Sequence, residues 1–223
     1  MRDELDRQTD QLSSTVVTMG ERADEMLGRA LQALQDSDLA AADVVIDADR
    51  ALDRAYEQIQ NGVLATVALH GPVGRDLRIL TGLLHVSLHA ERMADYAVGV
   101  ARTVKRVADE EPDPDLLEQL IEMGELARGV GRQSLEAFVQ ADAELAAAAS
   151  RLDDGVDRLN AGIFRRLVRL AADEDRLEWA TRMIQLTRQL ERYADHGVDI
   201  AEQAVFVATG KNRELSSEAM AGN

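Results

Sequence analysis

The sequence contains no cysteine, which excludes disulfides, thiolate metal sites and cysteine nucleophiles. Aromatic residues make up only 3% of the 223 residues, so β-strands would lack most of the residue types they prefer. Only three prolines interrupt the chain, and its many alanines and leucines favour helix. We therefore expect an all-α protein.

The sequence also lacks a run of about 18 apolar residues, the length that a membrane-spanning helix needs. Its first ten residues, MRDELDRQTD, are charged and contain no apolar core of a secretion signal. We therefore expect a cytoplasmic protein without membrane insertion. Acidic residues outnumber basic ones by 41 to 25, and a formal net charge of -16 would repel a polyanion over most of the surface. Binding to nucleic acid is not expected.

Turn-forming residues divide the chain into six segments that are long enough for helices. The breakers lie at residues 36–38, 70–72, 109–115, 140–142 and 173–175, and Gly210 is a typical helix C-cap. The expected helices span residues 5–35, 38–69, 75–108, 114–139, 142–171 and 175–209.

The two halves of the chain are similar to each other when they are compared at a fixed offset. At an offset of 104, Met19-Gly20-Glu21 matches Met123-Gly124-Glu125, and at an offset of 100, Glu91-Arg92 matches Glu191-Arg192. Short connections make neighbouring helices antiparallel. The sequence therefore predicts two tandem three-helix bundles related by internal pseudo-symmetry, in residues 1–110 and 111–210, followed by a polar, disordered tail at 211–223.

Acidic pairs lie opposite the apolar face of the third helix in each half. Apolar residues recur there at helical spacing, which is typical of a core-facing stripe. Glu91 and Asp95 lie about 160 to 200 degrees around the helix from Met93, and Glu191 and Asp195 occupy the equivalent positions. We therefore expect these acids to point away from the core, with two like charges side by side in each pair.

The second helix of each half supplies a matching acidic pair. Residue 72, in the predicted turn, is the midpoint of residues 53 and 91 and also of 49 and 95, and the corresponding pairs in the second half centre on residue 174. Residues equidistant from the turn of an antiparallel hairpin lie level with each other, so each hairpin should bring four carboxylates together. The eight candidate ligands are Asp49, Asp53, Glu91, Asp95, Asp153, Asp157, Glu191 and Asp195.

Four converging carboxylates repel one another unless they are protonated, turned into solvent or bridged by cations. Oxygen ligands favour magnesium, calcium, manganese or oxidised iron, and zinc also accepts carboxylates. A chain with 41 acidic residues also places acid pairs on solvated faces by chance. Because the arrangement occurs in both hairpins, it favours a site for divalent or trivalent metal ions in each half.

The remaining polar residues carry weaker signals. The four histidines do not form the Glu-x-x-His pattern of di-iron bundles, and most are expected at the surface or at helix ends. His196 adjoins Asp195 but points about 100 degrees away from it, which makes it at best an occasional co-ligand. The densest basic spot, either a solvated face or a docking point for an acidic partner, is formed by Arg165, Arg166 and Arg169.

The segments 90–98 and 190–202 resemble the two signature segments of the PhoU family, regulators of phosphate uptake and phosphate signalling, and the loop 72–78 is similar to that family's loop before its third helix. The resemblance covers nearly the whole chain. It implies two three-helix units, a homodimer, and metal clusters held by the eight acids named above. It also implies a non-enzymatic adaptor that damps a phosphate ABC transporter, through its ATPase subunit, and links it to a phosphate-sensing histidine kinase.

This chain departs from the family pattern at Gly99 and Asp199, where family members commonly carry Asn. The two metal sites are therefore expected to differ in metal count or affinity, the second being the more acidic. Two alternative functions are a metal-dependent phosphoester hydrolase and a metal-storage helical bundle. A hydrolase would need a pocket and an acid–base group beside the metals, and the sequence shows neither.

Overall fold

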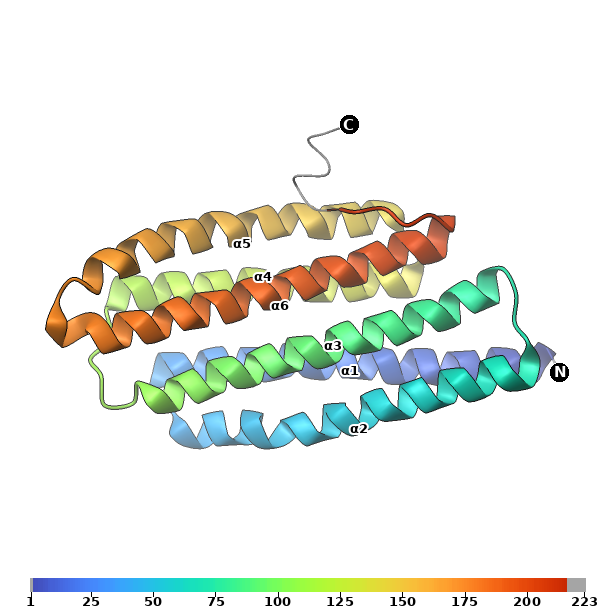
Figure 1. Cartoon of the computed structure of the whole chain (residues 1–223), viewed down its shortest axis with the longest axis horizontal. Coiled ribbons are helices and arrows are strands. Elements are labelled where there is room, and N and C mark those ends of the chain that lie inside the picture. The colour runs from blue at the N-terminus through green and yellow to red at the C-terminus, as the bar shows by residue number, and fades with distance from the viewer. Residues whose placement is uncertain (1, 216–223) are drawn as a thin grey trace.

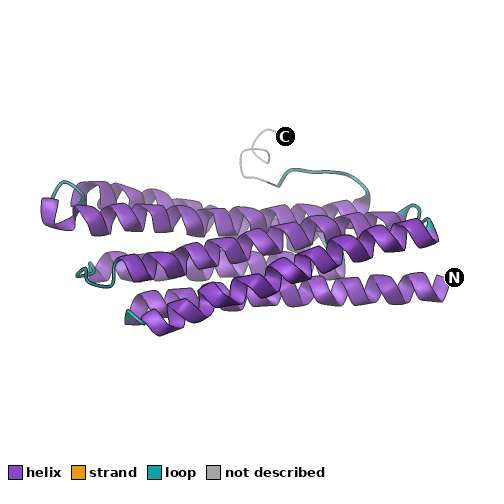
Figure 2. Ribbon diagram, turned by 60° about the horizontal axis from the view of Figure 1, so that its bottom comes forward, coloured by secondary structure: helices purple, strands orange, loops and turns teal. Residues whose placement is uncertain are grey.

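The computed structural model describes residues 2–215, which fold into long α-helices joined by short turns (Figure 1). No strand occurs within these residues (Figure 2), so the prediction of an all-α protein is confirmed. The elements are α1 Arg2–Asp36, α2 Leu39–His70, α3 Arg75–Arg106, α4 Pro114–Gln140, α5 Ala143–Leu170, the short 3-10 helix η1 Glu174–Arg176, and α6 Leu177–Thr209.

Aspartate caps explain why three of the helices begin where they do. The carboxylates of Asp38, Asp113 and Asp142 accept hydrogen bonds from free backbone N–H groups of the first turns of α2, α4 and α5, at 2.8 to 3.0 Å. At the end of α2, Gly71 has a left-handed backbone with φ of 56°, which costs glycine little. These turns lie where the sequence predicts them.

The last helix begins two residues later than predicted. The backbone N–H of Arg176 donates to Asp173 O over 3.1 Å, and the Asp173 carboxylate accepts from the backbone N–H of Asp175. These contacts form a tight 3-10 turn instead of the first α-helical turn, so α6 itself begins at Leu177. At the other end of the chain, α1 begins at Arg2 instead of residue 5.

The helices form two three-helix units that lie side by side. In Figure 1, α2 and α5 occupy opposite edges of the molecule, and α3 and α6 lie next to each other between them. Contacts within α1–α3 and within α4–α6 build the units, and α3 packs on α6 while α1 packs on α4 to join them. The predicted pair of pseudo-symmetric bundles is therefore confirmed.

The third helix of each unit has two buried faces instead of the single stripe that the sequence predicts. Leu83 and Leu186 belong to the predicted stripe and are 0% exposed. Alanines beside that stripe are 0% exposed as well, because α3 and α6 each contact both their own unit and the other one. These alanines are Ala94 and Ala101 on α3 and Ala194 and Ala201 on α6. Their small side chains allow the two helices to approach closely.

After α6 the chain folds back over α5 (Figure 1). Leu215 is only 1% exposed, its backbone N–H donates to Glu202 Oε1 over 2.8 Å, and its carbonyl oxygen accepts a hydrogen bond from Ser150 Oγ. Leu215 is thus an exception to the predicted polar tail at 211–223. Residues 216–223 of that prediction lie outside the described residues.

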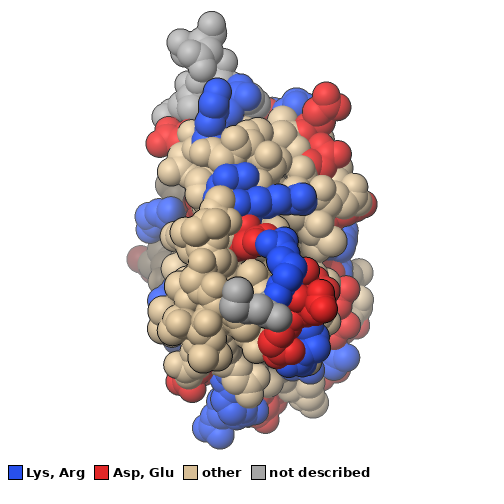
Figure 3. All heavy atoms as spheres, turned by 90° about the vertical axis from the view of Figure 1, so that its right-hand side faces the viewer, with Lys and Arg blue, Asp and Glu red and all other residues tan. Residues whose placement is uncertain are grey.

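The surface at the end that carries the N-terminus is mixed in charge. Acidic and basic side chains alternate there with uncharged ones (Figure 3), and Arg2 Nη1 donates to Asp76 Oδ2 over 2.6 Å. The large net negative charge therefore does not form a uniform acidic coat over this end. None of the helices in residues 2–215 has the length and apolar character to cross a lipid bilayer.

Candidate metal-binding site

The acids predicted in the first unit, which we call the first cluster, come from facing helices: Asp49 and Asp53 from α2, and Glu91 and Asp95 from α3. Burial raises the pKa of Asp49, and the charges of Asp53 and Asp95 raise it further. Burial also raises the pKa of Glu91, with added contributions from Asp95, Asp53 and Asp49. The hairpin therefore brings the four acids near enough to repel one another. Their role as metal ligands stays a prediction.

The second cluster, on α5 and α6, consists of Asp153, Asp157, Glu191 and Asp195. Burial, followed by the charges of Asp157 and Asp195, raises the pKa of Asp153 to about 7. Burial is also the main cause of the raised pKa values of Asp157, Glu191 and Asp195. Asp153 therefore holds its proton up to neutral pH, which relieves part of the repulsion within this cluster.

The acids are less exposed than expected. Only Asp53 and Asp157 are exposed, and the other six are half-buried. The Glu91 side chain is 16% exposed, and its buried Oε2 lies 3.4 Å from Arg92 Nε without making a hydrogen bond. The clusters therefore lie in the crevices between paired helices and do not project freely into solvent.

Arginines supply part of the positive charge that each cluster needs. Arg92 Nη1 donates to Asp95 Oδ2 over 2.9 Å, and at the equivalent positions Arg192 Nη1 donates to Asp195 Oδ2 over 3.2 Å. Within residues 2–215, no three of the eight carboxylates offer oxygen atoms that lie within 4.8 Å of one another. A single ion held by three of them would therefore require side-chain rotation.

A surface hollow of about 620 Å³ opens beside the second cluster, between α5 and α6. Asp157 and Glu191 line it, and Arg188, Asn160 and Thr187 contribute polar groups. The charge of Arg188 is close enough to Glu191 to oppose the rise in the pKa of that acid. The sequence does not show this hollow, because its shape depends on how the side chains of two helices pack.

A second group of potential ligands, which sequence reasoning missed, lies where α3 meets α6. His89 Nδ1 is 3.0 Å from His196 Nδ1, and Asp199 Oδ2 is 3.3 Å from His89 Nδ1 and 3.1 Å from His196 Nδ1. The His89 and His196 side chains are 15% and 22% exposed. The expectation of surface or capping histidines is therefore wrong for these two. No sequence signal pairs them, because 107 residues separate them and only the docking of the units brings them together.

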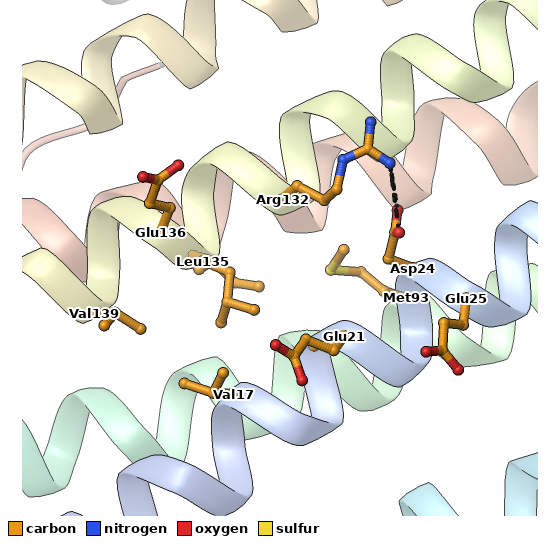
Figure 4. Close-up of a pocket in the computed structure, with 12 residues that line it drawn as sticks. Val17, Glu21, Asp24, Glu25, Met93, Arg132, Leu135, Glu136 and Val139 are labelled. Carbon is orange, nitrogen blue, oxygen red and sulfur yellow. Dashed lines mark hydrogen bonds and ion pairs between the residues drawn. The ribbon is translucent and has the colours of Figure 1, made fainter.

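The contact between α1 and α4 forms a groove of about 700 Å³ (Figure 4). Apolar side chains line much of it, among them Val17 of α1 and Leu135 of α4. At one end, Arg132 Nη1 lies 3.2 Å from Asp24 Oδ1. The groove uses residues of both units, so the sequence alone does not reveal it. None of the eight predicted ligands lines it.

Comparison with known proteins finds relatives that match nearly the whole chain. The family sequence model described as the PhoU domain matches residues 16–104 and 120–204. The phosphate-specific transport system accessory protein PhoU homolog of Clostridium acetobutylicum is 28% identical over 93% of this chain and 95% of its own length, and the homolog of Xylella fastidiosa is 30% identical over 94% and 86%. The crystal structure of PhoU from Pseudomonas aeruginosa superposes with a TM-score of 0.88 at 26% identity, covering 92% of this chain and 99% of that one. PhoU from Streptococcus pneumoniae has a TM-score of 0.86 at 25% identity, covering 94% and 99%.

Proposed function

This chain belongs to the PhoU domain family, and on that basis we propose that it is a phosphate-transport accessory protein that restrains phosphate uptake and phosphate-starvation signalling when phosphate is plentiful. Relatives that match it over nearly their full length are named as accessory proteins of the phosphate-specific transport system. In this proposal the protein is a non-enzymatic, cytoplasmic adaptor. It contacts the ATPase subunit of the phosphate ABC transporter and a phosphate-sensing histidine kinase, and it acts as a homodimer.

The observation that carries the metal part of this proposal is the repetition of a four-acid cluster on the same pair of helices in both units. Each cluster contains half-buried carboxylates whose pKa values are raised, first by burial and then by neighbouring acids. Burying several like charges is costly, and a multivalent cation would remove that cost. The proposed ligands take iron, manganese, magnesium or zinc.

Bound cations would also change what the surface attracts. A metal ion contributes the largest local charge in its site, so a loaded cluster would be positive where the unloaded cluster is negative. In the second unit, Arg188 in the adjoining hollow would add to this positive field. We propose that the loaded surface docks an acidic face of a partner protein or holds phosphate itself.

The metal proposal is tested by elemental analysis of the full chain purified without chelator. Replacing the first cluster pair, Glu91→Gln with Asp95→Asn, should remove the metal of the first cluster and leave that of the second. The matched control is Glu118→Gln with Glu122→Gln, an exposed pair on α4 with the same spacing of four residues. Equal metal content in all three proteins would overturn the cluster assignment.

The adaptor proposal is tested by pull-down of the metal-loaded chain against the ATPase subunit and the histidine kinase. Binding to both supports the adaptor, and binding to neither overturns it. If the Glu91→Gln, Asp95→Asn protein and its second-unit counterpart lose metal but keep both partners, the metal platform is wrong while the adaptor stands. Sedimentation of the same samples reports the oligomeric state.

The hydrolase alternative gains one observation, because the hollow beside Asp157 and Glu191 provides a pocket that the sequence does not show. Measurable turnover of a phosphoester by the metal-loaded chain, lost in Glu191→Gln with Asp195→Asn, would support this reading over the adaptor. The storage alternative would instead show many ions per chain, taken up and released without any effect on partner binding.

A further inference from the structure

Three potential ligand atoms converge where the two units meet, outside both carboxylate clusters. They are Nδ1 of His89 on α3 and, on α6, Nδ1 of His196 and Oδ2 of Asp199, and the three pairs are separated by 3.0, 3.1 and 3.3 Å. We propose that these residues form a binding site for one divalent transition-metal ion of the zinc type, which ties α3 to α6. This site does not depend on the function proposed above.

The spacing of the three atoms fits a metal ion closely. Ligand atoms about 2.0 to 2.1 Å from a tetrahedral zinc ion lie about 3.3 Å from one another. An ion at that distance from all three atoms would sit about 1 Å above their plane, with a fourth position left for water or another ligand. The triangle therefore needs only small adjustments of its side chains to accept an ion.

Hydrogen bonding explains the triangle less well. A proton on His196 Nδ1 can point along the 3.1 Å edge to Asp199 or along the 3.0 Å edge to His89, but not along both. Whichever partner this proton points to, at least one of the other close contacts in the triangle then sets two lone pairs or two protons against each other.

The donor set contains two ring nitrogens, which the all-oxygen carboxylate clusters lack. Two imidazole nitrogens with one carboxylate oxygen suit zinc, cobalt, nickel, copper or ferrous iron, whereas magnesium and calcium prefer oxygen ligands alone. Ring stacking supports this site, since the rings of Tyr96 and His196 are stacked with centroids 5.6 Å apart. Tyr96 therefore limits the orientations available to the His196 imidazole.

The internal symmetry of the protein shows that the site exists on one side of the α3–α6 contact only. At the repeat offset of 100, the equivalents of His89, His196 and Asp199 are Gln189, Tyr96 and Gly99. On that side the Gln189 side chain fills the space over the glycine, and a Cβ added at Gly99 would lie 2.5 Å from Gln189 Oε1. Equivalent backbone positions therefore hold potential metal ligands on one side of the α3–α6 contact and non-ligating, packed residues on the other. This difference provides a matched control within the molecule.

The consequence of a bound ion would be mechanical. His89 belongs to the first unit and the other two ligands belong to the second, so the ion would crosslink the units at their contact. Binding to the folded state alone also raises the unfolding temperature, by an amount that grows with the logarithm of the ligand concentration relative to the dissociation constant. Bound zinc would therefore restrict movement of one unit relative to the other, and no residue of either carboxylate cluster would ligate it.

The test uses the full chain stripped of metal and titrated with Zn²⁺ against a chromophoric chelator, and with Co²⁺ followed by visible absorption. Imidazole NMR signals report binding at the histidines themselves. We expect the His89 and His196 signals to shift at one equivalent of Zn²⁺, and Co²⁺ to give the strong absorption of a tetrahedral site. His89→Gln and Asp199→Asn should each weaken Zn²⁺ binding at the histidines at least about tenfold.

The control Gln189→Ala alters the equivalent position on the other side of α3–α6 and should change Zn²⁺ affinity less than about twofold. His89→Gln introduces the residue that already packs at the equivalent position, so it should fold, and circular dichroism checks this. Unchanged histidine signals on addition of Zn²⁺, or full Co²⁺ absorption in His89→Gln, would overturn the proposal. Retention of these signals in Glu191→Gln with Asp195→Asn would separate this site from the second cluster, and their loss would show that the carboxylates supply the site instead.

Discussion

Asp24 and Arg128 occupy equivalent positions in the two repeats, 104 residues apart, and pair with each other across the contact between α1 and α4. Arg128 Nη2 donates to Asp24 Oδ2 over 2.9 Å, and the two side chains are only 19% and 16% exposed. The two units are related by a pseudo-twofold axis that runs between them, and residues at equivalent positions can touch only near this axis. The two repeats have therefore diverged to opposite charges at this position, where like charges would face each other.

Because this pair is largely buried, removing one partner should cost more than breaking a surface ion pair. Asp24→Asn is expected to lower the free energy of unfolding by about 1 to 2 kcal/mol, measured by urea denaturation, since Arg128 then keeps only Glu125. Exchanging the two residues should recover only part of that loss. Glu21 is the equivalent of Glu125 and can support an arginine at position 24, but Arg132, which pairs with Asp24, would then face a like charge. A double exchange no more stable than the single variant would show that the pairing is not what stabilises this contact.

Two glycines allow α1 and α4 to approach each other, and they are also related by the repeat. A Cβ added at Gly20 would lie 2.6 Å from Leu135 Cδ2, and one at Gly124 would lie 2.5 Å from Leu31 Cδ2. We expect Gly20→Ala and Gly124→Ala each to destabilise the protein by about 1 to 3 kcal/mol, because the leucines must leave their packed positions.

The control for these glycine variants is Gly129→Ala on the same helix α4, where an added Cβ meets nothing within 4 Å. Alanine is the better helix former, so this variant should stabilise the protein by up to about 1 kcal/mol. The two classes of variant are compared by their urea midpoints. Equal effects would mean that helix propensity, and not close packing, decides the response.

The raised pKa of Asp153, about 7 in the folded state, predicts a pH dependence of stability. The folded protein holds this proton over a range in which the unfolded chain, with a carboxyl pKa of about 3.9, has already lost it. The group's contribution is therefore most favourable below about pH 4 and is lost as the pH rises through 7. In metal-free protein, Asp153→Asn should be more stable than the parent at pH 8, by about 1 kcal/mol after allowance for solvent screening, and nearly equal to it at pH 4.

Asp10→Asn, at an exposed position on α1, serves as the control for a simple change of net charge. It should shift the thermal midpoint little, and by a similar amount at both pH values. A gain for Asp153→Asn that is equally large at pH 4 and pH 8 would contradict the assignment of the effect to this carboxyl group.

Leu215 holds the end of the described chain against α5 and α6, where its backbone bonds to Ser150 and Glu202. Leu215→Ala should cost about 2 to 4 kcal/mol of unfolding free energy, because the side chain is 1% exposed and leaves a cavity when truncated. Lys211→Ala, at an exposed position nearby, should be close to neutral. Thermal unfolding of the two variants side by side measures the difference.

Much of the local structure follows from the sequence because its causes are local. Asp38, Asp113 and Asp142 cap the helices that they precede, so breaker residues locate the turns. The midpoint at residue 72 places acids of α2 opposite acids of α3, and the effect of Asp95 on the pKa of Asp49 agrees with that placement. Hairpin register depends only on chain length and helical rise, which can be counted in advance.

The sequence by itself determined the helices, the repeat and which acids share each hairpin, since helical periodicity and short turns act over a few residues. Only the tertiary structure decided how the two units dock, because that depends on the close packing of small side chains such as Ala94 and Ala194 from distant segments. The meeting of His89 with His196 and the pairing of Asp24 with Arg128 follow from that docking. Contacts between residues more than 100 positions apart leave no periodic trace in the chain, and shape complementarity between folded surfaces creates them.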